Sequence, residues 1–278
     1  QLALGTVDIE AFRVRARGEQ ETRTRASAAL QEREAADLRL REEATKRKNA
    51  PLFAEQERKA ELRRFRNRFG QPFIEKQHYR KVMGILRSVD SGVPIGKADL
   101  LFFAGEGGDY WTPQLRQTHH KILAEQAAVG WQNTKDVWQA INSCGHWRKA
   151  GIPDNGLRIA KEALEQKTRP KARSALLTTG GGALRDLRQR AEAVQFGSEA
   201  HLLTPEDFRP CTLLGAVHIE MGDIVIGAEW YEKAEARGAI REMIDRELAS
   251  ILRAAPQDQR VQFKTALKGY DASRYNWL

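Results

Sequence analysis

The sequence predicts an all-α protein with a long basic helical arm, a small helical module and about three paired-helix repeats followed by a capping helix. Three observations lead to this prediction. Residues 19–48 contain neither Gly nor Pro and are rich in Ala, Leu, Arg and Glu, which favours helix. Apolar residues recur at helical spacing in later segments. Segments 174–207 and 208–241 superimpose at a spacing of 34 residues, a period typical of stacked helix pairs.

The arm is expected over residues 1–70, which carry 17 basic and 12 acidic residues. Pro51, in the stretch Asn49-Ala50-Pro51, is expected to interrupt the helix, so that residues 52–69 form a second one. The thin apolar stripe holds no heptad, which argues against a strong coiled coil. Acidic residues stand four positions before basic ones, the orientation that stabilises a helix surface. These pairs are Glu19/Arg23, Glu21/Arg25, Asp37/Arg41, Glu42/Lys46 and Glu43/Arg47.

The small helical module is expected over residues 71–135. Residues 78–89 show apolar residues at helical spacing, and residues 97–103 predict a short apolar helix. Thr112 and Pro113 then mark a helix start, with Thr as the N-cap and Pro at the first helical position. This helix is expected to continue to about Val129.

The repeats are expected over residues 136–241, as copies at 137–170, 174–207 and 208–241. Each copy places small residues where two antiparallel helices must approach closely. Turns are expected near residues 187–190 and at Gly222-Asp223. An ordinary array of helical hairpins with the same spacing is the alternative. The residues that define the pattern are Cys144, Gly151 and Ala163, then Gly181, Ala193, Ala200 and Pro205, then Leu214, Gly215, Tyr231 and Ala234.

This pattern resembles the tetratricopeptide repeat (TPR) family over about residues 137–241. Leu214 and Gly215 match repeat positions 7 and 8, while Tyr231 and Ala234 match positions 24 and 27. The resemblance implies a solenoid of helix pairs, with residues 242–278 as a C-terminal capping helix (242–255) and tail. At position 4 the family's aromatic residue is replaced by Ala140, Leu177 and Cys211.

The resemblance also implies a concave groove lined by positions 2, 5, 9, 12 and 13 of each first helix. Carried onto this chain, these positions include Gly182, Asp186, Ala216 and Ile219. Four cations against two anions predict a mildly basic groove, without the family's Lys and Asn clamp for a peptide carboxylate. The alternative is that these are simply exposed helix residues. The expected binding residues are Trp138, Arg148, Lys149, Thr178, Arg185, Arg209, Thr212 and Glu220.

No catalytic residue, metal ligand or cofactor is predicted, and the chain is expected not to be an enzyme. His119 and His120 are adjacent, so on a helix they point about 100° apart and cannot share a metal ion as residues four apart can. The glycine-rich segments 105–108 and 180–182 lack the Lys-Ser/Thr context of a phosphate loop.

The net charge is +9, and all of the excess lies before residue 171. Such a charge is consistent with an acidic partner. No stretch approaches the ~20 apolar residues of a membrane span, and the first residues do not resemble a signal peptide, so a cytoplasmic protein is expected. Cys144 and Cys211 are expected to be small buried apolar residues rather than a disulfide.

These observations predict a scaffold or adaptor that binds a partner protein, or an acidic segment of one, in the groove. The alternative is a nucleic-acid-binding accessory subunit or appended module of a DNA- or RNA-processing or defence complex, in which the basic arm contacts phosphates. No membrane partner is expected.

Overall fold

The computed structural model describes residues 8–278, and every regular element in these residues is a helix. The prediction of an all-α protein is therefore confirmed. The described residues form two units, with the boundary between Phe65 and Arg66. Residues 1–7 of the predicted arm lie outside the described residues. Within residues 8–278, no helix combines the length and the apolar character needed to cross a membrane.

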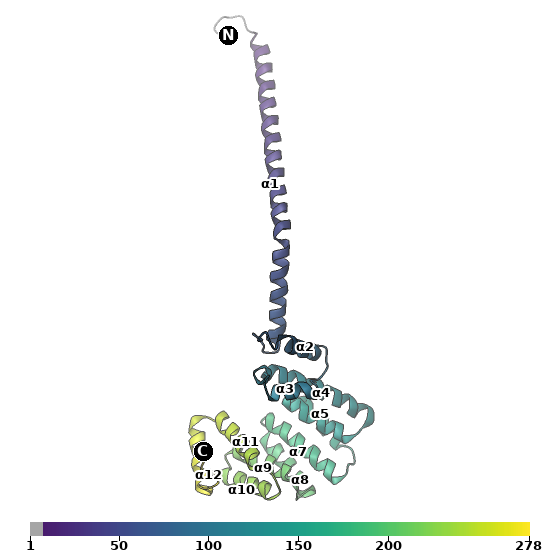
Figure 1. Cartoon of the computed structure of the whole chain (residues 1–278), viewed down its shortest axis with the longest axis vertical. Coiled ribbons are helices and arrows are strands. Elements are labelled where there is room, and N and C mark those ends of the chain that lie inside the picture. The colour runs from purple at the N-terminus through teal and green to yellow at the C-terminus, as the bar shows by residue number, and fades with distance from the viewer. Residues whose placement is uncertain (1–7) are drawn as a thin grey trace. The chain divides into compact units, whose positions relative to one another are not determined.

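The first unit is formed by α1 (Ile9–Arg68), whose last residues belong to the second unit. The predicted interruption at Pro51 is wrong, because α1 continues through this residue (Figure 1). Pro51 removes the hydrogen bond to the carbonyl of Arg47, at a cost of ~3 kcal/mol. Strong helix formers on both sides offset this cost, and Arg47 is exposed, so water can hydrate its carbonyl.

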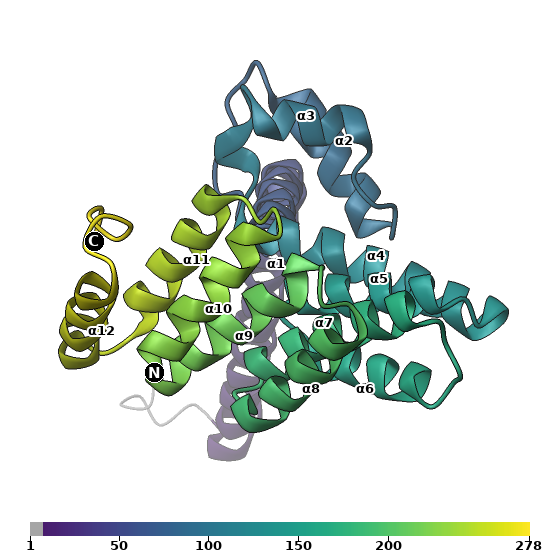
Figure 2. The ribbon, with the colours of Figure 1, turned by 90° about the horizontal axis from the view of Figure 1, so that it is seen from below.

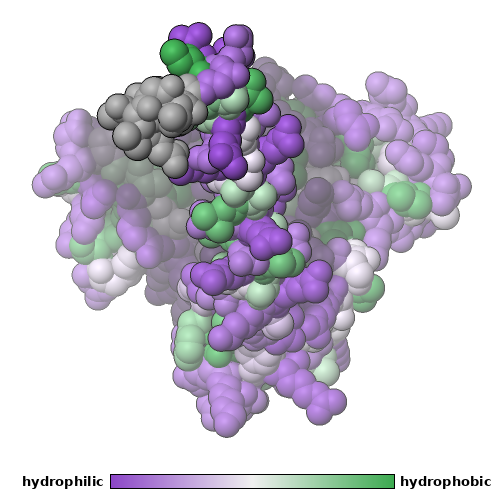
Figure 3. Space-filling view, turned by 90° about the horizontal axis from the view of Figure 1, so that it is seen from above, coloured by the Kyte–Doolittle hydropathy of each residue, from purple (hydrophilic) through white to green (hydrophobic). Residues whose placement is uncertain are grey.

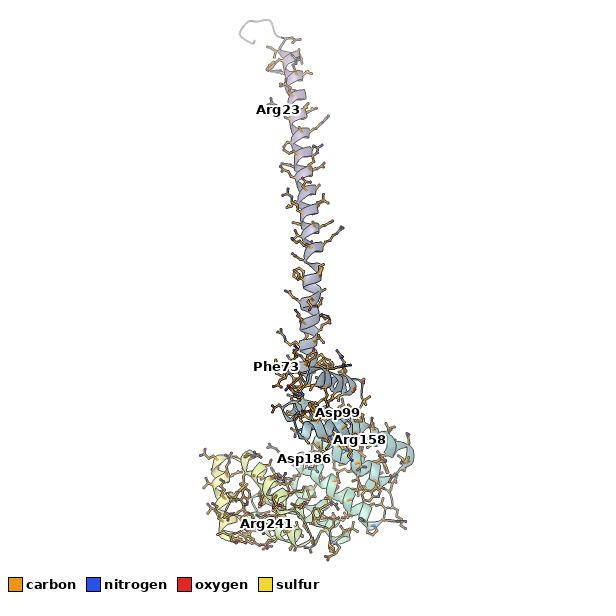
Figure 4. The ribbon with its side chains drawn as sticks, viewed as in Figure 1. Arg23, Phe73, Asp99, Arg158, Asp186 and Arg241 are labelled. Carbon is orange, nitrogen blue, oxygen red and sulfur yellow. The ribbon has the colours of Figure 1, made fainter. Side chains whose placement is uncertain are left out.

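Every side chain of α1 is at least partly exposed, so this helix depends on intrinsic propensity rather than on packing. Viewed from its N-terminal end, hydrophilic residues predominate and hydrophobic ones are scattered (Figure 3). Arg23 extends away from the helix (Figure 4). Of the predicted pairs, Glu21 and Arg25 lie within ion-pair distance at 3.9 Å. Such exposed pairs contribute about 0.5 kcal/mol or less each.

The second unit begins with a helical module. It contains α2 (Tyr79–Asp90), α3 (Lys97–Ala104), the 3-10 helix η2 (Gly108–Tyr110) and α4 (Pro113–Thr134). The predicted N-cap is confirmed, because the Thr112 hydroxyl accepts a hydrogen bond from the Leu115 N–H at 3.2 Å. α4 ends beyond the predicted Val129. Its last turns are held by the buried Trp131, whose indole N–H donates to Glu162 of α6 at 3.3 Å.

Eight further helices follow in consecutive pairs: α5 (Val137–Lys149) and α6 (Pro153–Leu164), α7 (Pro170–Asp186) and α8 (Arg190–Leu203), α9 (Phe208–Met221) and α10 (Ile224–Ala236), α11 (Arg241–Ala254) and α12 (Gln257–Tyr270). α7 begins at Pro170, before the expected Ser174, since Pro suits the first helical position. The segment expected to be a tail contains α12, which packs mainly on α10.

The pairs form one continuous array (Figure 2). The two helices of each of the first three pairs contact each other, and the first helices α5, α7, α9 and α11 contact one another in that order. This arrangement places the last turns of the first helices close together. α9 ends at Gly222, whose φ of +93° is a left-handed conformation that glycine adopts without strain.

Three consecutive glycines inside α7 each allow a different neighbour to approach. A Cβ atom at Gly180 would lie 3.2 Å from the Ala160 methyl of α6, and one at Gly181 would overlap Leu213 of α9. A Cβ atom at Gly182 would overlap the Arg148 guanidinium of α5. Close packing on three sides therefore explains a glycine run that lowers helix propensity by roughly 1 kcal/mol per residue.

The core of the array consists of two hydrophobic clusters, one centred on α4 to α9 and the other on α9 to α12. Tyr275, after α12, is 1% exposed and belongs to the second cluster. The neighbouring Arg274 lies between Glu235 of α10 and Asp245 of α11, at 2.6 and 2.7 Å. These contacts fix the C-terminal segment against the last helices of the array.

Candidate binding groove

A hollow of about 760 Å³ lies where the last turns of α5, α7 and α9 meet α11 and α12. We call it the arginine hollow. Four arginines and three carboxylates line it, together with an apolar edge that includes Ile251 and Phe263. Figure 4 marks Asp186, at the end of α7. The charged lining residues are Arg148, Arg185, Arg188, Arg190, Asp186, Glu220 and Glu247.

Arg185 is the centre of this charge network. Its guanidinium contacts Glu220 of α9 at 2.8 Å and Glu247 of α11. Its side chain is 15% exposed, and Glu220 and Glu247 are 21% and 34% exposed, so both ion pairs are partly shielded from water. Burial lowers its pKa, but Glu247 and Glu220 outweigh that effect and raise the pKa overall. Arg185 therefore joins three consecutive first helices, α7, α9 and α11.

A second ion pair joins α5 to α7. The Arg148 Nε donates to the Asp186 carboxylate at 2.7 Å, and a second nitrogen donates at 3.3 Å. The absence of a side chain at Gly182 makes room for this guanidinium. Arg190, the first residue of α8, lies 3.5 Å from Glu220, which it shares with Arg185.

The hollow is less basic than the sequence predicts, because carboxylates already neutralise most of its arginines. Its lining carries one more positive than negative charge. Arg188, in the turn between α7 and α8, is exposed and forms no ion pair within residues 8–278. Its φ of +62° is a left-handed conformation. Arg188 is therefore the cation in the hollow that remains available to an anionic group.

The structure brings three of the predicted binding residues together in the hollow: Arg148, Arg185 and Glu220. Lys149 is exposed at the end of α5, and Thr178 donates its hydroxyl to the Ser174 carbonyl within α7. The remaining predicted residues lie at the opposite, N-terminal ends of the first helices. They are Trp138 in the first turn of α5, and Arg209 and Thr212 in the first turns of α9.

Four groove positions carried over from the TPR pattern are corrected. Gly182 is buried, and the Arg148 guanidinium lies over it. Ala216 and Ile219 are fully buried in the second hydrophobic cluster, so they cannot contact a ligand. Arg209 pairs with Asp207 at 3.1 Å, near its own helix start, rather than converging with Arg148 and Arg185. The reason is geometric: residues at the two ends of a helix of 14 residues lie roughly 20 Å apart.

Sequence reasoning missed Glu247, Arg188, Arg190 and the apolar edge from α11 and α12. Glu247 lies 62 positions from Arg185, so no local spacing relates the two residues. Arg188 and Arg190 lie in and beside a predicted turn, which the pattern of first-helix positions omits. A continuation of the 34-residue repeat into α11 would not have suggested Glu247 either, because residue 247 falls at position 6, which is not a groove position.

The histidines form a cluster that the sequence did not predict. His120 of α4 and His146 of α5 face each other with 3.1 Å between their Nδ1 atoms, and His119 Nδ1 accepts from the Ile95 N–H at 3.0 Å. Burial lowers the pKa of all three rings, and together with neighbouring positive groups it lowers that of His120 to about 4. Residues 8–278 contain no group of three or more potential metal ligands.

Both cysteines are free and buried, as predicted. Burial raises the pKa of the Cys144 thiol to about 12, and it also raises that of Cys211. The thiolate forms needed for nucleophilic or metal chemistry are therefore disfavoured at neutral pH.

Comparison of the chain with protein-family models, curated proteins and solved structures gives no match.

Proposed function

We propose that this chain is a scaffold or adaptor whose TPR-type array holds a short segment of a partner protein in the arginine hollow. The hollow itself is the observation that carries the proposal. At about 760 Å³ it is in the range of sites that enclose a few side chains of a ligand. Rigid packing of four successive first helices holds its lining in place.

The small residues of the three pairs support the TPR-type assignment. Cys144, Gly181 and Gly215, at position 8, are all buried. A Cβ atom at Gly215 would lie 2.9 Å from the Tyr231 ring, so the two helices of this pair approach closely. Ala163, Ala200 and Ala234, at position 27, are 0% exposed.

The chemistry of the hollow favours a segment with an acidic side chain next to an apolar one. Arg188 offers a guanidinium without an internal partner among the described residues, which suits a carboxylate. Ile251 and Phe263, each 7% exposed, add a small apolar edge to the same hollow. Because Arg148 and Arg185 are already paired, the electrostatic contribution to binding rests mainly on Arg188.

Peptide binding to the full chain tests this proposal. Fluorescence anisotropy is measured with labelled peptides in which one Glu adjoins one Leu, and with matched peptides that carry Gln instead. We expect the Glu peptides to bind more tightly, and Arg188→Glu to weaken them at least about tenfold, since a charge-assisted hydrogen bond contributes ~1.5–3 kcal/mol.

The matched control is Arg158→Glu, which makes the same charge change on an exposed residue of α6 outside the hollow (Figure 4). An equal loss of peptide affinity in both variants, or equal affinities for the Glu and Gln peptides, would contradict the proposal. Reversal of Arg185 is a poor test, because it would place a third carboxylate beside Glu220 and Glu247 and destabilise the array.

A further inference from the structure

A second hollow, of about 570 Å³, lies between α11 and α12. We call it the α11–α12 pocket. Its charged lining consists of Arg246 and Arg253 from α11 and Arg260 and Lys264 from α12. No Asp or Glu side chain lines this pocket among the described residues. Its chemistry therefore differs from that of the arginine hollow, where three carboxylates are interspersed with the arginines.

The four cations of the α11–α12 pocket are not neutralised internally. Arg246 Nε donates to the Glu242 carbonyl at 3.1 Å, and Arg253 Nε donates to the Ala249 carbonyl at 3.3 Å. These are backbone acceptors in the same helix, and they leave the other guanidinium N–H groups available. Within residues 8–278, ion pairs to carboxylates join Arg185 and Arg274 to their neighbours, but none involves the four pocket cations.

Two of the cations also shape the pocket. Arg260 Nη2 donates to the carbonyls of Arg253 and Ala255 at 3.2 and 3.0 Å, so it closes the C-terminal end of α11. Its Nε is buried and has no hydrogen-bond partner among the described residues. Lys264 Nζ donates to the Leu278 carbonyl at 3.0 Å and holds the C-terminal segment beside the pocket.

The same segment supplies an aromatic ring. Trp277 lines the α11–α12 pocket and is 40% exposed, and Ala249 and Leu252 add apolar surface. A cationic groove that carries an exposed aromatic ring combines the two elements by which proteins bind single strands. Cations contact the phosphates, and a base stacks on the ring.

We propose that the α11–α12 pocket binds a short stretch of single-stranded nucleic acid, with phosphates on Arg246, Arg253, Arg260 and Lys264 and a base on Trp277. Arg260 and Lys264 are one helical turn apart, roughly 6 Å along α12, so their charges can follow a phosphodiester backbone. A duplex exposes its phosphates on a wide, rigid cylinder and offers no free base face to Trp277, so a single strand fits better.

This site differs from the predicted contact through the arm. The arm carries 17 basic residues over residues 1–70, but 12 acidic residues are interleaved with them. Cations that are not separated by carboxylates produce a more positive local potential, which attracts a polyanion more strongly. The α11–α12 pocket therefore meets the requirement for phosphate binding better than the arm does.

The test measures the affinity of the full chain for a labelled oligothymidylate as a function of salt. Each phosphate contact contributes ~0.7 to the slope of log affinity against log salt for single strands, so four contacts give up to about 2.8. Affinity should then fall about 50-fold between about 50 mM and about 200 mM salt. For Arg246→Ala with Arg253→Ala we expect a slope of about 1.4 and a fall of about sevenfold.

Arg158→Ala with Lys171→Ala is the matched control, since both residues are exposed, form no ion pair within residues 8–278 and lie outside the pocket. This control should keep the wild-type slope. Trp277→Ala should weaken binding about tenfold, whereas Trp277→Phe should retain most of it, because the phenyl ring still stacks. Circular dichroism confirms that each variant is folded.

Several outcomes overturn the proposal. A slope that is unchanged in Arg246→Ala with Arg253→Ala would place the contact elsewhere, with the arm as the first alternative. Binding of duplex DNA as tight as that of the single strand would remove the role of Trp277. Displacement of the oligonucleotide by poly-glutamate at equal charge concentration would identify an acidic polypeptide as the ligand of the pocket.

Discussion

The arm and the array are both helical, but different forces stabilise their helices. Every residue of α1 is at least partly exposed, and its composition of Ala, Leu, Arg and Glu favours helix by intrinsic propensity. The array instead uses residues that disfavour helix, such as Gly180, Gly181 and Gly182, because they allow close packing. Local propensity therefore explains the arm, and tertiary contact explains the array.

Ion pairs show the same contrast. In α1, the side chains of Arg25 and Glu21 are 84% and 71% exposed, so water screens their attraction. In the array, Arg185 and Glu220 are 15% and 21% exposed and join two helices. Ion pairs between Arg and Glu thus contribute little to stability in α1, whereas in the array they hold neighbouring helices in position.

The largest effect is expected for Gly215→Leu. A side chain at Gly215 overlaps the Tyr231 ring, so the substitution should destabilise the array by ~3 kcal/mol, the upper end for overpacking. Gly18→Leu is the control in α1, where a new Cβ atom meets nothing within 4 Å. The urea midpoint of the array should be lower in Gly215→Leu and unchanged in Gly18→Leu. Equal midpoints would show that position 215 is not a close contact.

Arg185→Ala should destabilise the array by about 2 kcal/mol, a value between those of exposed and buried ion pairs. The substitution leaves Glu220 and Glu247 near each other without their shared cation. Arg173→Ala is the comparison, because Arg173 and Glu199 are 34% and 47% exposed and should contribute ~1 kcal/mol or less. If both variants lost a similar free energy of unfolding, burial would not explain the strength of the Arg185 ion pairs.

Acidification should destabilise the array through the histidine cluster. The pKa values of His119, His120 and His146 in the folded state lie below the ordinary value of 6.5, with that of His120 at about 4. Between these values the unfolded chain binds more protons than the folded one. The contribution of the histidine cluster to the stability of the array is thus fully present above about pH 6.5. It is lost as the pH decreases toward about 4.

Thermal unfolding across this pH range checks the expectation. His120→Gln with His146→Gln removes two of the three rings and should flatten the pH dependence of Tm. A Tm profile parallel to that of the wild-type chain would show that other groups cause the acid sensitivity.

The smallest effect on the array is expected for Pro51→Ala. This change restores a hydrogen bond in α1 and favours its helix locally by ~3 kcal/mol. Because residue 51 belongs to the first unit, the array's free energy of unfolding should change by less than ~0.5 kcal/mol. Limited proteolysis near residue 51 should become slower while the urea midpoint of the array stays the same. A changed midpoint would mean that the two units unfold together.

Much of the fold could be predicted because its signals are local. Thr112 and Pro113 mark the start of α4, and Gly222 marks the end of α9. Local rules also failed at identifiable places. Pro51 does not end α1, since the neighbouring sequence favours helix strongly enough to continue. Two of the inferred groove residues, Ala216 and Ile219, are buried in the second hydrophobic cluster, where Ile219 packs closely on Gly227 of α10.

The candidate site could be predicted only in part. The TPR pattern placed Arg148, Arg185, Asp186 and Glu220 in the groove, and these residues do meet in the arginine hollow. It did not indicate that Asp186 and Glu247 neutralise the two arginines. The charge of the hollow depends on partners from other helices, so counting charged positions along first helices overestimated it.

The sequence by itself determined that the chain is helical, where several of its turns lie and which positions must be small. These features depend on interactions between residues a few positions apart, such as the hydrogen bonds of a helix and the caps at its ends. Only the tertiary structure decided which charges are neutralised and which are free. Arg185 meets Glu247 across 62 residues, while Arg246 and Arg253 meet no carboxylate among the described residues. Such pairings follow from how successive helices stack, since stacking brings distant positions into contact.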